Sequence, residues 1–175
     1  ETLSGYQQAL ERGCHTLAIT TGGKLSRLAQ EAQQPLWLFE HKGQPRAAVG
    51  FSFALLLAAL VKMGFLPDPS DEIQETIQVM RQQQEQIQAE VPAARNPAKR
   101  LAGQLVGRWV SVFGSGLLSP VARRWKGQIS ELAKAWAQFE FLPEANHNTL
   151  AGILNPEDLF SRSIAIFLQC SSDHP

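Results

Sequence analysis

The spacing of apolar residues predicts that helices and short strands alternate along the first part of the chain. Leu3, Tyr6 and Leu10 follow one another at intervals of three and four, which is typical of a helix, and Gly13 is a natural stop. The same reading predicts a buried strand and turn over 15–23, a helix over 24–33 and a strand over 34–40. Because parallel strands need a crossover between them, this alternation predicts a parallel sheet with helices on its faces.

The most apolar stretch of the chain covers residues 47–65. A helix that spans a membrane needs about 20 predominantly apolar residues. Here Ser52, Lys62 and two glycines interrupt the run, and Arg46 precedes it. We therefore expect a buried core helix rather than a membrane helix.

A long polar helix is predicted over residues 69–92, with a start signal at Ser70 or Asp71 ahead of Glu and Gln. Its apolar stripe is thin and includes Ile73 and Ile77. It is interpreted as a connection between two lobes. A coiled-coil dimer arm is the alternative, although the heptads are few. The predicted organisation is a first lobe over 1–68, a helical linker over 69–107 and a second lobe over 108–175.

The second lobe begins with a strand, a glycine turn and a helix, which is the order of a nucleotide or sugar-phosphate fold. Ser119 is expected to cap this helix, and Pro120 to take its first position. One apolar face is predicted to run along the helix through Val121, Trp125, Ile129, Leu132 and Trp136. A loop over 142–152 and a strand over 162–170 follow. The expected class is α/β, with two lobes of parallel sheet flanked by helices, each lobe incomplete.

The charge balance narrows the range of partners. The 16 basic and 16 acidic residues cancel, so no net field would steer a nucleic acid or a membrane surface to the chain. Cys14 and Cys170 stand alone without a CxxC pattern, which argues against a structural zinc site and for a reducing cytoplasm, with both thiols buried. The chain opens on Glu1, and no signal peptide is expected.

Three residues are candidates for chemistry, and each has an ordinary alternative. Glu131 lies beside the predicted apolar face, where it is either a solvated glutamate or a base. His147 lies between two asparagines, where it is either a loop histidine or one whose tautomer the loop fixes. Arg46 follows a strand and opens a helix, so it is either a surface arginine or one that holds a phosphate or an enediolate.

Two glycine turns are weaker candidates for phosphate binding. Gly114 and Gly116 stand between a strand and a helix, where backbone amides could hold a phosphate, but a turn without a ligand is equally consistent. The motif TTGGK is no complete phosphate loop because Leu25 follows its lysine. No role is assigned to the other histidines, which are His15, His41 and His174.

The segments "NPAKRLAGQLVGR", "VFGSGLLSPVARRWKGQISELAKAWA" and "LPEANHN" together resemble the bifunctional phosphoglucose/phosphomannose isomerases. Those enzymes are built from two sugar isomerase (SIS) domains. The opening "ETLSGYQQA", the motif "QPRAA" and the closing "IFLQCSSDHP" resemble the same family. The resemblance covers essentially the whole chain, and residues 96–148 are its most specific part.

The resemblance implies an enzyme that interconverts glucose 6-phosphate and mannose 6-phosphate with fructose 6-phosphate, a reaction of glycolysis and gluconeogenesis, without metal or cofactor. It implies that Glu131 moves a proton between C1 and C2 through a cis-enediol. His147 would open the sugar ring from the partner subunit of a homodimer, and Arg46 would stabilise the enediolate. The chain departs from the family pattern at Ser130 and Leu132, where asparagine is frequent, so the support of the base differs.

The resemblance also implies that the chain is an internal fragment. The family's Ser-Gly-Asn-Thr loop would precede Glu1, and its last helices would follow Pro175. The fragment alone is therefore expected to be inactive, and the activity belongs to the parent protein. Two alternatives stay open, which are a non-catalytic SIS module that senses a sugar phosphate and an SIS isomerase of another sugar phosphate.

Overall fold

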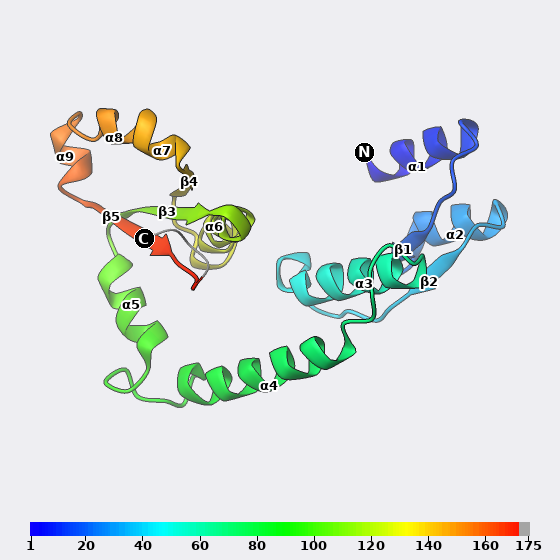
Figure 1. Ribbon diagram of the computed structural model, residues 1–175, viewed down its shortest axis with the longest axis horizontal. Helices are drawn as coiled ribbons and strands as arrows, with labels where there is room; N and C mark the ends of the chain where they lie inside the picture. The colour runs from blue at the N-terminus through cyan, green and yellow to red at the C-terminus, as the bar shows by residue number, and fades with distance from the viewer. Residues whose placement is uncertain (172–175) are drawn as a thin grey trace. The chain divides into compact units, whose positions relative to one another are not determined.

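The computed structural model describes residues 1–171 and divides into two compact units, Glu1–Asp68 and Pro69–Pro175 (Figure 1). Each unit has its own parallel sheet, with two strands in the first and three in the second. The mixed α/β class predicted from the sequence, with parallel sheets flanked by helices, is confirmed. His174, to which no role was assigned, lies outside the described residues.

The first unit follows the predicted alternation of helix and strand. Its elements are α1 (Thr2–Glu11), β1 (Ala18–Thr20), α2 (Gly23–Glu31), β2 (Leu36–Leu38), a 3-10 helix (Pro45–Ala47) and α3 (Val49–Lys62). Strands β1 and β2 pair in parallel, with Ala18 opposite Leu36, and α2 is the crossover between them. Ala29 of α2 is fully buried, so this helix contributes to the small core of the unit.

Helix α3 is not the buried core helix that its composition predicts. Ala59 is its one buried residue, whereas Phe53 is 63% exposed and Leu56 is 59% exposed. A two-stranded sheet offers too little surface to cover a helix that is apolar on all sides. The prediction of a buried helix is therefore wrong for this unit. Among residues 1–171, no helix is long and apolar enough to cross a membrane.

The second unit opens with two helices, α4 (Ser70–Ile87) and α5 (Pro97–Leu105). The predicted long polar helix is confirmed, and it begins at Ser70 with none of its residues buried. The turn between the helices depends on Asn96, which is fully buried. Its side chain donates to the carbonyl of Gln88 at 3.1 Å and accepts from the amide of Lys99 at 3.0 Å. Both polar ends of the amide are thus satisfied, and α5 has an N-cap.

The core of the second unit lies between a three-stranded sheet and one helix. The strands are β3 (Trp109–Ser115), β4 (Ala137–Leu142) and β5 (Ser163–Leu168), all parallel, in the order β4-β3-β5. Successive side chains of a strand point to opposite faces. Val110 and Val112 are therefore buried together with Ala122 of α6 (Ser119–Gln128), which packs on β3 and β4 (Figure 1).

The helix after the glycine turn is shorter than predicted. A π-helix (Ile129–Ala133) follows α6, and Lys134 ends it with a φ of 56° in the left-handed region. The wider π turn displaces the residues that follow from the predicted apolar face, so Leu132 is 60% exposed and Trp136 is 73% exposed. Val121, at the start of α6, is also 40% exposed. The prediction of one continuous apolar face is therefore wrong at these three residues, and only Trp125 and Ile129 of the predicted face pack against the core.

The sequence pattern did not predict strand β4. It predicted a helix that continues to Trp136 and a loop after it. Ala137, Phe139 and Phe141 alternate with polar residues, and this period of two is the signature of a strand. The predicted loop is also wrong, because two short helices, α7 (Glu144–His147) and α8 (Thr149–Gly152), follow the strand. Helix α9 (Glu157–Phe160) then leads to β5, the strand predicted over 162–170.

The glycine turn between β3 and α6 is confirmed, but its predicted cap is not. Helix α6 begins at Ser119 itself, whose hydroxyl donates to the carbonyl of Gly114 at 3.1 Å. The serine therefore links the helix back to the strand and does not cap it. Cys14 and Cys170 are both exposed because each follows the end of an element, and the prediction of buried thiols is wrong.

Candidate active site

Glu131 lies on the π-helix, and its side chain is exposed. The ammonium group of Lys134 donates to the main-chain carbonyl of Glu131 at 2.6 Å. This contact closes the turn that carries the glutamate. Single-turn π-helices occur frequently at functional sites, because they change the direction in which one side chain points.

His147 is the last residue of α7, and it is also exposed. The side-chain amide of Asn148 donates to the Glu144 carboxylate at 2.7 Å, and its oxygen accepts from the amide of Thr149 at 2.5 Å. The Asn148 side chain therefore links the start of α7 to the start of α8 by hydrogen bonds. The asparagine beside His147 does fix the local backbone, although it does so in two short helices and not in a loop.

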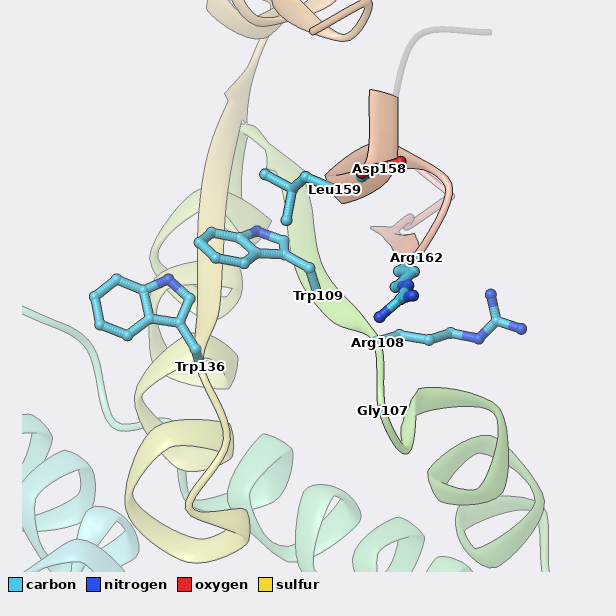
Figure 2. A pocket seen from close by; sticks show the side chains of 7 residues that line it. All are labelled: Gly107, Arg108, Trp109, Trp136, Asp158, Leu159 and Arg162. Atoms are coloured by element: carbon cyan, nitrogen blue, oxygen red, sulfur yellow. The ribbon is translucent and has the colours of Figure 1, made fainter. Parts of the chain in front are cut away.

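Within the chain, Glu131 and His147 lie towards opposite ends of the parallel strands of the three-stranded sheet. Since β3 and β4 are parallel, α6 and the π-helix run back from the carboxyl end of β3 to the amino end of β4. Figure 2 shows β4 rising from the end of this helix beside Trp136. Helix α7 follows the carboxyl end of β4. The six residues of β4 span roughly 20 Å, and this length separates the amino ends of the strands from their carboxyl ends.

Arg46 belongs to the first unit, where it is part of the 3-10 helix Pro45–Ala47. The prediction that it follows a strand and opens a helix is confirmed, because β2 precedes it and α3 follows. Its side chain is half-buried. Arg46 is thus on a separate unit from Glu131 and His147.

A cavity of about 460 Å³ lies at the amino ends of the strands (Figure 2). Trp109 opens β3, Trp136 precedes β4 and Arg162 precedes β5, so three strand starts meet there. The two indole rings lie 5.9 Å apart between their centroids. The full lining consists of Gly107, Arg108, Trp109, Trp136, Asp158, Leu159 and Arg162.

A second cavity of about 450 Å³ also contains Trp136 and lies against the turn that carries Glu131. Its polar lining comes from Lys126, Ser130 and Lys134. The sequence reading missed this group, although the four-residue spacing of the three side chains would place them on one side of a helix. Two ammonium groups beside the candidate base would attract an anionic substrate.

The described residues 1–171 contain no group of three or more His, Cys, Asp or Glu side chains that could hold a metal ion. The glycine turn before α6 includes Gly116 with a φ of +46°, a conformation that favours glycine. Phosphate binding at that turn stays a prediction.

Residues 94–175 match the family described as the bacterial phospho-glucose isomerase C-terminal SIS domain. The chain is 39% identical, over 99% of its length, to the bifunctional phosphoglucose/phosphomannose isomerase of Caldicellulosiruptor bescii, of which it covers 52%. It is 31% identical, over 99% of its length, to the enzyme of that name in Aquifex aeolicus, of which it covers 50%.

A third relative has another name. The chain is 30% identical, over 86% of its length, to the D-glucosamine-6-phosphate 4-epimerase of Sulfolobus acidocaldarius, of which it covers 46%. No solved structure gives a significant match. The chain spans about half the length of the curated relatives it matches. Residues 94–175 therefore match an SIS domain, and nearly the whole chain is similar to enzymes named bifunctional phosphoglucose/phosphomannose isomerase.

Proposed function

We propose that this chain is part of an aldose–ketose isomerase that interconverts glucose 6-phosphate and mannose 6-phosphate with fructose 6-phosphate. The observation that carries the proposal is the 39% identity, over 99% of the chain, to a relative named for both reactions. Within the enzyme we assign residues 1–68 to the first SIS domain, 69–107 to a helical linker and 108–175 to the second SIS domain. These substrates belong to glycolysis and gluconeogenesis, which places the enzyme in the cytoplasm.

The proposed chemistry needs one base and one positive charge. A proton next to a carbonyl group is weakly acidic, so a carboxylate must face the C1–C2 edge of the open-chain sugar while a cation holds the developing oxyanion. Glu131 is the proposed base, and Arg46 is the proposed cation. One base over one face of the cis-enediol serves both epimers, because rotation about C2–C3 presents the other face of the sugar. His147 is proposed to open the ring as an acid/base group.

The placement of the two acid/base groups supports a site made from two chains. Glu131 lies towards the amino end of β4, and His147 follows the carboxyl end of the same strand. General acid–base catalysis requires each group within hydrogen-bond reach of the substrate. A single sugar phosphate would have to extend across the length of β4 to contact both in one chain. We therefore propose a homodimer in which His147 reaches the site that contains the partner's base.

A complementation experiment tests this arrangement. The complete reading frame is co-expressed as Glu131→Gln and His147→Ala chains with different tags, and the hybrid dimer is purified. One of its two sites then has both groups intact and the other has neither. We expect the hybrid to retain about half of the wild-type kcat, while each variant homodimer is nearly inactive. A hybrid as inactive as the two homodimers would mean that both groups act within one chain.

A second candidate, an SIS enzyme of an amino-sugar phosphate, is favoured by the relative named as an epimerase. The wild-type protein is therefore assayed with fructose 6-phosphate and with glucosamine 6-phosphate, and all products are followed by NMR. Formation of both glucose 6-phosphate and mannose 6-phosphate supports the proposal. Turnover of the amino sugar alone would favour the second candidate. Binding of fructose 6-phosphate without turnover would indicate a sensor module.

A further inference from the structure

The loop between β2 and α3 carries Arg46, and a second side chain in this loop contacts its backbone. His41 is half-buried, and its Nε2 lies 3.2 Å from the carbonyl oxygen of Gln44. The amide of Ala47 donates to the same oxygen at 2.9 Å, which closes the 3-10 turn Pro45–Ala47. In the tautomer with a proton on Nε2, His41 donates to the residue at which the arginine's turn begins.

Aromatic contacts fix the other side of the His41 ring. The ring centroid lies 5.5 Å from that of Phe51, in the first turn of α3. Phe51 in turn stacks on Phe39, directly after β2, with 5.0 Å between centroids. Three rings therefore join the end of the strand, the loop and the start of the helix.

The loop backbone also passes close to the ring. A Cβ atom on Gly43 would lie 2.9 Å from Cε1 and 3.1 Å from Nε2 of His41. Real side chains do not approach so closely, so a side chain at position 43 would push the ring away from Gln44. The histidine thus fills the inside of the loop, with the backbone on one side and Phe51 on the other.

From these contacts we propose that His41 is a positioning residue that sets the direction of the Arg46 guanidinium group. The inference rests on the proposed function, because it assigns His41 a part in the same reaction. His41 does not need to touch the substrate, since it acts on the turn that carries the arginine. A displacement of about 1 Å in such a group can cost 10²-fold in rate.

The test uses the complete reading frame and fructose 6-phosphate. His41→Phe keeps a ring against Phe51 and loses the hydrogen bond, whereas Gly43→Ala keeps the histidine and displaces it. We expect each variant to lower kcat about tenfold, with KM for fructose 6-phosphate and the melting temperature nearly unchanged. The matched control is His15→Phe, at an exposed histidine, for which we expect wild-type kcat.

A double-mutant cycle separates action through Arg46 from any other effect. In an Arg46→Ala background, His41→Phe is expected to lower kcat no further, because the group that it positions is gone. An equal loss in both backgrounds, or wild-type kcat in His41→Phe, overturns the inference while the role of Arg46 stands. If Arg46→Ala itself leaves kcat unchanged, the proposed role of Arg46 fails, and the inference about His41 fails with it.

Discussion

Replacing Glu131 by glutamine in the complete reading frame is expected to remove the formation of both glucose 6-phosphate and mannose 6-phosphate from fructose 6-phosphate. Glutamine has nearly the same shape but cannot accept the C1 or C2 proton. Because general acid–base catalysis contributes about 10²–10⁴-fold, we expect kcat to fall by about 10³-fold for each product. The measurement follows both products by NMR, and calorimetry determines whether fructose 6-phosphate still binds.

The matched control is Glu75→Gln, which removes an exposed carboxylate from α4 far along the chain from the base. We expect this variant to keep wild-type kcat. Loss of one product alone in Glu131→Gln would show that two bases serve the two epimers. Unchanged formation of both products would make Glu131 an ordinary helix glutamate, and the base would have to be sought among other residues.

The second large effect is expected at Gly114, where alanine should lower the free energy of unfolding by about 3 kcal/mol. A Cβ atom there would overlap the carbonyl oxygen of Leu118, lie 2.8 Å from its carbonyl carbon and lie 3.2 Å from Cβ of Ala122. The first two contacts are with backbone, so no side-chain rotation relieves them. The strand and α6 would have to separate, and this would open the core around Val112 and Ala122.

Denaturant titration followed by tryptophan fluorescence measures the effect at Gly114. Three of the four tryptophans, Trp109, Trp125 and Trp136, belong to the second unit, so the fluorescence mainly reports this unit. The control is Gly103→Ala inside α5, where an added Cβ meets nothing within 4 Å. We expect it to stabilise the protein by about 0.5–1 kcal/mol, since alanine favours a helix over glycine. Similar midpoints for the two variants would contradict the proposed close packing at Gly114.

The sequence predicted the elements whose apolar pattern has one clear period. Helices α1, α2 and α4 and strands β1, β2 and β3 follow such patterns and lie where they were expected. Strand β4 was missed because Trp136 continues the helical spacing from Leu132, while the period of two begins only at Ala137. Short apolar segments are compatible with both periods, and only the π-helix and the turn at Lys134 decide between them.

The candidate site was accessible from the sequence only in part. Glu131, His147 and Arg46 were named from residue type and from the family resemblance, and their roles stay proposals. Their arrangement could not be inferred, because it depends on β4 lying between two of them. The contacts of His41 were equally hidden, since a ring that packs on Phe51 and a backbone carbonyl leaves no pattern along the chain.

The separation of Glu131 and His147 by the length of β4 affects how covariation between these two positions in related sequences should be interpreted. Positions that vary together across relatives are usually taken to be in contact within one fold. If the active site combines two chains, covariation between these two positions records a contact between subunits. A distance restraint derived from it and applied within one chain would then bend or break β4, although the strand is correct.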